Sequence, residues 1–177
     1  MSDAIRVESV AQGMISLRGD LASTAVQKAV KSAAGTGVPT QRQVLASGDF
    51  SVLWMSPDEL LVLVPYDKAE EKTSHLQKSL ASEHHLAVNV SDARTLFRIE
   101  GKGVREVLAK GAPVDLAPGQ FEFGMVRRTR IGLLAAAFWM PQADTFNIIC
   151  FRSVGAYMET WLKHASRADS LPGVFVT

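Results

Sequence analysis

A glycine-rich turn is the first feature of this sequence whose residue types could do chemistry. Gly101 and Gly103 flank a lysine between an expected strand and an expected helix, where a loop could hold a phosphate. A dinucleotide-binding loop needs a third glycine three residues later, and that position is Glu106, whose charge would repel a pyrophosphate. No Gly-Lys-Ser/Thr sequence follows, so a plain turn is the better interpretation.

Histidine and cysteine are the next candidates, for metal binding and nucleophilic catalysis. His75 and His84 are nine residues apart, which places them on opposite faces of a helix, and the adjacent His84 and His85 point apart. The fourth histidine, His164, is remote in sequence. Cys150 has apolar neighbours on both sides, which raise the pKa of a thiol and leave it unreactive. We therefore expect no metal site and no nucleophilic cysteine.

The most distinctive charged feature is Arg127, Arg128 and Arg130 on an expected strand. Alternation along a strand directs Arg128 and Arg130 to one face and Arg127 to the other. Two interpretations stay open: a solvated face or protected sheet edge, and a surface that binds carboxylates of another subunit. Asp92 and Arg94 are a second candidate, either as an internal ion pair or as part of such an interface.

The elements that position these residues repeat along the chain. The apolar pattern predicts strand, helix, hairpin and helix in each half, and the second half has expected strands at 126–131, 133–140 and 145–151. Trp54-Met55 and Trp139-Met140 stand at corresponding places. We therefore predict an α+β fold of two similar split βαβ-type (ferredoxin-like) subdomains. Each has a small antiparallel or mixed sheet with helices, and the two exchange C-terminal strands.

The expected boundary between the subdomains lies at residue 91. Residues 1–91 form the first α+β subdomain and residues 92–177 form the second. Neither half is large enough to bury a stable core alone, so we predict that together they make one compact unit.

Composition predicts a soluble, cytoplasmic protein. Hydrophobic residues make up 47% of the 177 residues and charged residues 21%, as in folded domains. The formal net charge of +1 gives no field to attract nucleic acid or a membrane surface. A single cysteine is typical of a reducing compartment. Residues 1–13 lack the apolar run of a signal peptide, and the apolar stretch 133–140 is too short to span a membrane.

Beyond these features, the segment Val90–Leu116 resembles the gamma subunit of heterotetrameric sarcosine oxidase. Further similarity lies in Phe123-Gly124, in the strand containing Thr129-Arg130, and in Arg152-Ser153 with the helix that carries Tyr157 and Trp161. The similarity covers most of the chain from Met14 to about Ala165 and is most specific in the central segment.

The resemblance implies a fold and a place in a complex. That family is similar to a shortened form of the folate-binding T-protein of the glycine cleavage system, with two similar α+β subdomains. It implies a complex that oxidises sarcosine to glycine with oxygen as acceptor, while tetrahydrofolate takes up the one-carbon unit. The implied partners are the alpha, beta and delta subunits, with FAD, FMN, NAD and tetrahydrofolate in the large subunits and zinc in the smallest. The resemblance implies no cofactor and no catalytic residue in this chain.

An alternative function is a stand-alone folate-binding or one-carbon transfer protein with the same fold. That function needs a carboxylate in a cleft to hold the pterin, and Asp92 and Asp115 are the candidates in the matching segment. The site prediction is therefore a subunit interface at Asp92, Arg94, Arg127, Arg128 and Arg130, without catalytic, cofactor-binding or metal-binding residues.

Overall fold

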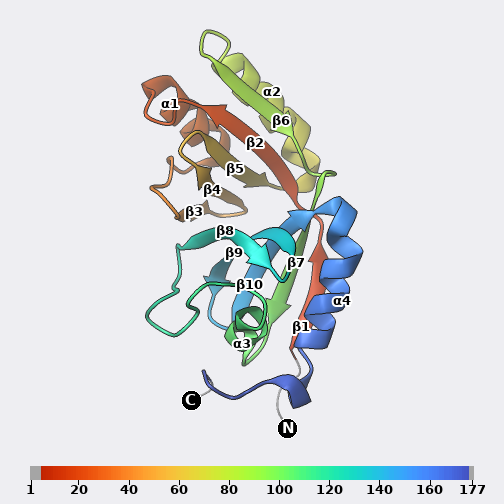
Figure 1. Cartoon of the computed structure of the whole chain (residues 1–177). Helices are drawn as coiled ribbons and strands as arrows, with labels where there is room; N and C mark the ends of the chain where they lie inside the picture. Colours follow the sequence, from red (N-terminus) through yellow and green to blue (C-terminus); the bar gives the residue numbers. More distant parts are fainter. Residues whose placement is uncertain (1–4, 176–177) are drawn as a thin grey trace. The chain divides into compact units, whose positions relative to one another are not determined.

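The computed structural model describes residues 5–175, which fold into two compact units. The first unit contains Ala11–Asp92, and the second combines residues 5–10 with residues 93–175. Each unit has one five-stranded sheet in which all neighbouring strands are antiparallel (Figure 1). This arrangement confirms the predicted α+β fold class.

The first unit orders its strands β3-β4-β5-β2-β6. Its elements are β2 (Gly13–Gly19), α1 (Thr24–Ala34), β3 (Val44–Ser47), β4 (Phe50–Ser56), β5 (Glu59–Val64), α2 (Ala69–Ser79) and β6 (His85–Asn89). The Ser23 hydroxyl accepts a hydrogen bond from the Ala25 amide and so caps α1, and Gly35, with φ of 69°, is the C-cap residue after the helix. These signals set the helix between β2 and the β4–β5 hairpin.

Burial of one strand face by the helices makes the core of the first unit. Val26 and Val30 of α1 and Leu76 of α2 pack with alternate residues of the central strands. Those strand residues are Ile15, Leu17, Val52, Leu60, Val62 and Val64. Ala29 and Ala33 complete the stripe of α1, and their small side chains let the helix lie close to the sheet.

The second unit orders its strands β1-β7-β10-β9-β8. Its elements are β1 (Arg6–Val10), β7 (Arg94–Glu100), α3 (Val104–Ala109), β8 (Val126–Ile131), β9 (Leu134–Gln142), β10 (Thr145–Phe151) and α4 (Gly155–Ala165). Val107 of α3 and Met158 and Leu162 of α4 pack against Phe97, Phe138 and Ile148 of the sheet. In Figure 1, α4 lies along β1, and the two elements are in contact.

The two units share one topology. In each, a strand and a helix precede a short strand, a hairpin and a second helix, and both hairpin strands keep the same places in the sheet. Trp54 lies on β4 and Trp139 on β9, which are corresponding strands. The place of β6 in the first sheet is taken by β1 in the second. The repeated order of elements was thus correctly predicted.

The strand that completes the second sheet is a correction to the prediction. We expected an exchange of C-terminal strands and placed residues 1–91 in the first subdomain. Instead, Arg6–Val10 pairs with β7, and Val7 lies opposite Ile99. Residues 166–175 contain no strand, so β7 would otherwise be an open edge. The segment was overlooked because it is short and only partly apolar, and long-range pairing decides its structure.

Candidate functional site

The arginine edge, defined as Arg127, Arg128 and Arg130, lies on β8 at one edge of the second sheet. Arg128 and Arg130 are exposed, whereas Arg127 is half-buried, as alternation along a strand predicts. Arg128 lies opposite Ala137 of β9, and Arg130 lies opposite Ala135. Because both opposing side chains are methyl groups, β9 contributes no carboxylate at these two positions.

Arg127 has a structural role on the other face of the strand. Its guanidinium carbon lies 5.6 Å from the centroid of the Phe121 ring, and its Nη1 donates to the Val126 carbonyl at 3.0 Å. Phe121 is fully buried and packs against Phe138 and Phe146, with centroid distances of 5.5 and 5.6 Å. Arg127 therefore covers an aromatic cluster in the core, in a cation–π arrangement.

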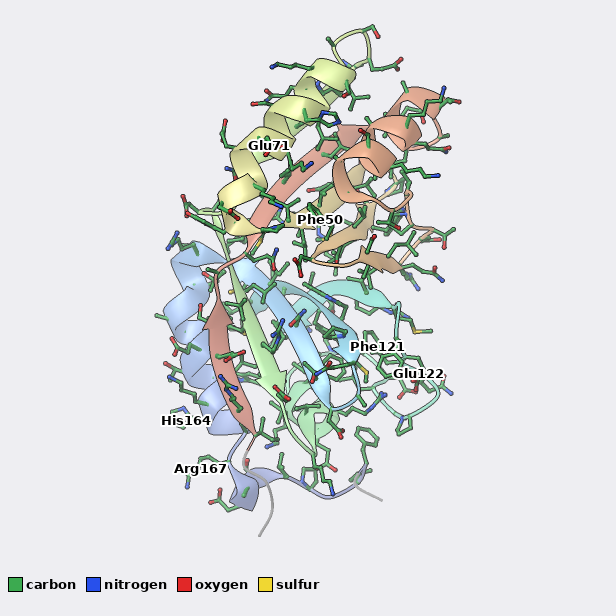
Figure 2. The ribbon with its side chains drawn as sticks, turned by 180° about the vertical axis from the view of Figure 1, so that it is seen from behind. Phe50, Glu71, Phe121, Glu122, His164 and Arg167 are labelled. Carbon is green, nitrogen blue, oxygen red and sulfur yellow. The ribbon has the colours of Figure 1, made fainter. Side chains whose placement is uncertain are left out.

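The connection that carries Phe121 is held in place by Arg105 of α3. Its Nη1 donates to the carbonyl oxygens of Leu116 and Phe121, each at 2.8 Å. Its Nη2 lies 3.5 Å from the Glu122 carboxylate. Figure 2 labels Phe121 and Glu122 on this irregular segment, which runs from α3 to β8. One planar guanidinium thus fixes a connection without regular structure.

Of the other predicted interface residues, Arg94 lies apart from the arginine edge within the second sheet. Arg94 begins β7, separated from β8 by β10 and β9, or roughly 14 Å at the usual spacing of strands. Its guanidinium lies 5.9 Å from the ring of Phe151, which is 55% exposed. Asp92 belongs to the first unit, where it accepts a hydrogen bond from the Tyr66 hydroxyl at 2.9 Å. The Asp92–Arg94 ion pair stays a prediction.

The carboxylates proposed for a pterin site, Asp92 and Asp115, do not line the groove beside α1. Asp115 is exposed, and its Oδ1 accepts from the Ala117 amide at 3.0 Å, which is local turn chemistry. A surface groove of the first unit is lined by residues of α1 together with Ser79 and Glu83. Neither Asp92 nor Asp115 is among its lining residues.

The residue at the third position of the glycine pattern, Glu106, is bonded to the chain's own backbone. Gly101 and Gly103 have φ of 132° and 91°, and Gly103 is the N-cap residue before α3. Glu106 is only 1% exposed, and its carboxylate accepts hydrogen bonds from the amides of Gly173 and Phe175, both at 2.8 Å. A carboxylate that binds the chain's own amides replaces the third glycine of a dinucleotide loop.

The remaining candidates for chemistry are dispersed or buried. Cys150 is 3% exposed, and burial raises the pKa of its thiol to about 11. Within residues 5–175, no three His, Cys, Asp or Glu side chains are close enough to hold a metal ion. His75 instead shares a 3.0 Å hydrogen bond with Ser32. Over the same residues, no helix is long and apolar enough to cross a membrane.

Known structures define the class of the fold. The aminomethyltransferase T of the glycine cleavage system from Bartonella henselae superposes with a TM-score of 0.68 at 12% identity, over 91% of this chain and 46% of that one. The regulatory subunit of aspartate kinase from Thermus thermophilus superposes with a TM-score of 0.51 at 14% identity, over 94% of this chain and 100% of that one. Both similarities concern the fold alone. They place the chain among α+β proteins built from paired ferredoxin-like units.

The family is more specific than the fold. Residues 18–168 match the sarcosine oxidase, gamma subunit family, and the chain belongs to that family. A chain of the heterotetrameric sarcosine oxidase from Corynebacterium sp. U-96, solved in complex with pyrrole 2-carboxylate, superposes with a TM-score of 0.87 at 26% identity. That superposition covers 96% of this chain and 87% of the other.

Two curated relatives match this chain over only part of their own length. Sarcosine oxidase subunit gamma from Corynebacterium sp. strain P-1 is 28% identical over 136 residues, or 76% of this chain and 66% of the relative. The subunit from strain U-96 is 29% identical over 137 residues, or 76% of this chain and 65% of the relative. The match thus spans just under two thirds of the length of each relative.

Proposed function

We propose that this chain is the non-catalytic gamma subunit of a heterotetrameric sarcosine oxidase. The observation that carries the proposal is the superposition on a chain of such an oxidase, with a TM-score of 0.87 over 96% of this chain. The family match over residues 18–168 supports the same assignment. The subunit helps to assemble a flavoenzyme that oxidises sarcosine to glycine and passes the one-carbon unit to tetrahydrofolate.

In this proposal the partners are the alpha, beta and delta subunits, and the complex is cytoplasmic. FAD, FMN, NAD, tetrahydrofolate and zinc belong to those partners rather than to this chain. The exposed guanidinium group of Arg130 gives the subunit a surface suited to carboxylates of a partner. The alternative, a stand-alone folate-binding protein, has less support because Asp92 and Asp115 are exposed and bonded to neighbouring groups of their own units.

The test is affinity purification of the tagged chain from its native cells. We expect it to bring down larger subunits, to absorb at flavin wavelengths and to release peroxide when sarcosine is added. A colourless, partner-free protein that binds tetrahydrofolate would contradict the proposal and would favour the alternative function.

A further inference from the structure

A leucine side chain projects from the tip of the β8–β9 hairpin. Leu133 is 91% exposed, compared with 51% for the exposed Leu86 of β6. It is the second residue of a two-residue turn that closes the pair Ile131 and Leu134, and it follows Gly132, whose φ is 59°. Such turns favour Gly, Asn, Asp and Ser, because these residues suit the backbone and interact with water. A leucine here contributes almost no buried contact to this chain.

The hairpin tip is firmly held. The amide of Gly132 donates to the Gly111 carbonyl at 2.9 Å. Gly111 in turn lies against α4, because a Cβ atom added to it would come within 2.6 Å of Trp161 Cζ2. Trp161 packs against the core of the second unit. A side chain on such a fixed base loses little backbone freedom when a partner binds it.

Positive charge lies next to the leucine on the same hairpin. Arg130 is three residues before Leu133, is exposed, and lies opposite the exposed Ala135. An apolar centre close to an arginine matches the composition of protein interfaces, in which a buried anchor is surrounded by a polar rim.

We infer that Leu133, with Arg130 on the same hairpin, docks into an apolar socket of a partner subunit whose rim carries carboxylates. The inference rests on the proposed function and identifies the contact through which this subunit joins its complex. Carboxylates are the complementary groups, because the arginine fork binds them bidentately. A second copy of this chain is disfavoured, since a symmetric contact through this hairpin would bring arginines together.

The experiment measures the affinity of the full chain for the remaining subunits of the oxidase, produced together without this chain. Leu133→Thr removes the apolar anchor at a position that is 91% exposed, so the fold loses almost no buried contact. The matched control is Leu86→Thr, the same change at an exposed leucine of the first unit. Burial of one leucine corresponds to a factor of about 10 to 100 in affinity. We expect Leu133→Thr to weaken binding by that factor and Leu86→Thr to change it less than about twofold.

Charge reversal tests the rim separately. Arg130→Glu should weaken binding and reduce its dependence on salt, whereas Lys28→Glu, on the exposed side of α1, should do neither. Tighter binding by Arg130→Glu would contradict the inference that carboxylates surround the socket of the partner.

The outcomes also separate this inference from the proposed function. If the unaltered chain binds and Leu133→Thr binds equally well, the docking hairpin is overturned while the proposed function stands. If the unaltered chain does not bind the oxidase subunits, the proposed function and the docking hairpin are both refuted. If Leu133→Thr only abolishes self-association, the hairpin contacts a second copy, and the inferred partner is wrong.

Discussion

The buried carboxylate of Glu106 should be the main anchor of residues 173–175. Glu106→Ala removes the acceptor of two hydrogen bonds, from the amides of Gly173 and Phe175, both at 2.8 Å. A hydrogen bond to a charged group contributes about 1.5–3 kcal/mol net. The two amides return to water when released, so the lower figure applies to each. We therefore expect a loss of about 3 kcal/mol in the local stability of this segment.

Amide hydrogen exchange measured by NMR reports this loss directly. At about 1.4 kcal/mol per tenfold change, the amides of Gly173 and Phe175 should exchange roughly a hundred times faster in Glu106→Ala. Glu106→Gln keeps one acceptor but turns an NH2 group toward the other amide, and its effect should be intermediate.

The matched control is Glu122→Gln, which also alters a carboxylate that accepts from a backbone amide. Glu122 accepts from Gly119 in an exposed connection, so its loss should cost less than about 1 kcal/mol and leave residues 173 and 175 unaffected. Exchange at Gly173 and Phe175 that changes less than about threefold in Glu106→Ala would refute the reasoning.

Three further predictions concern packing, pH and the connection before β8. Gly111→Ala should lower the free energy of unfolding by about 1–3 kcal/mol, because its Cβ would lie 2.6 Å from Trp161 Cζ2; Gly37→Ala, with open space around it, should be neutral or slightly stabilising in the same urea titration. Burial raises the pKa of the Cys150 thiol from its ordinary value of 9.0 to about 11 in the folded state. At pH values between these two, the thiol therefore ionises only in the unfolded state. Stability should therefore fall as pH rises through this range, by up to about 1.4 kcal/mol per pH unit, and an equally steep fall in Cys150→Ala would argue against this cause. Arg105→Lys cannot donate to two carbonyls in the same planar geometry, so thermal unfolding should show a loss of about 1–2 kcal/mol; an unchanged Tm would contradict the anchoring role.

Strands bracketed by strong turn signals could be predicted to the residue. The expected strands 126–131 and 145–151 coincide with β8 and β10. The expected strand 133–140 is shifted, because Gly132 starts a two-residue turn and β9 begins only at Leu134. Leu133, expected in the strand, is therefore an exposed turn residue. The signal that could have located the turn is Gly132, because a glycine between two expected strands is typical of a two-residue hairpin turn.

Features that depend on distant pairing could not be predicted. The arginines were expected to alternate between faces, and they do, but the edge position of β8 depends on the order of all five strands. The burial of Glu106 depends on amides more than 60 residues later. Likewise, β1 is a strand only because β7, some 90 residues away, offers it a partner edge. Local sequence patterns hold no information about such partners.

Reconstitution of the oxidase from separately produced subunits tests the central proposal most directly. The remaining subunits would be mixed with and without this chain, and the assembly would be followed by size-exclusion chromatography with absorbance at flavin wavelengths. Incorporation of this chain at one copy per flavin-containing complex, with more complete assembly and higher sarcosine-dependent peroxide release, is the predicted result. A complex that assembles and turns over sarcosine equally well without this chain, while the chain elutes alone, would contradict the proposal.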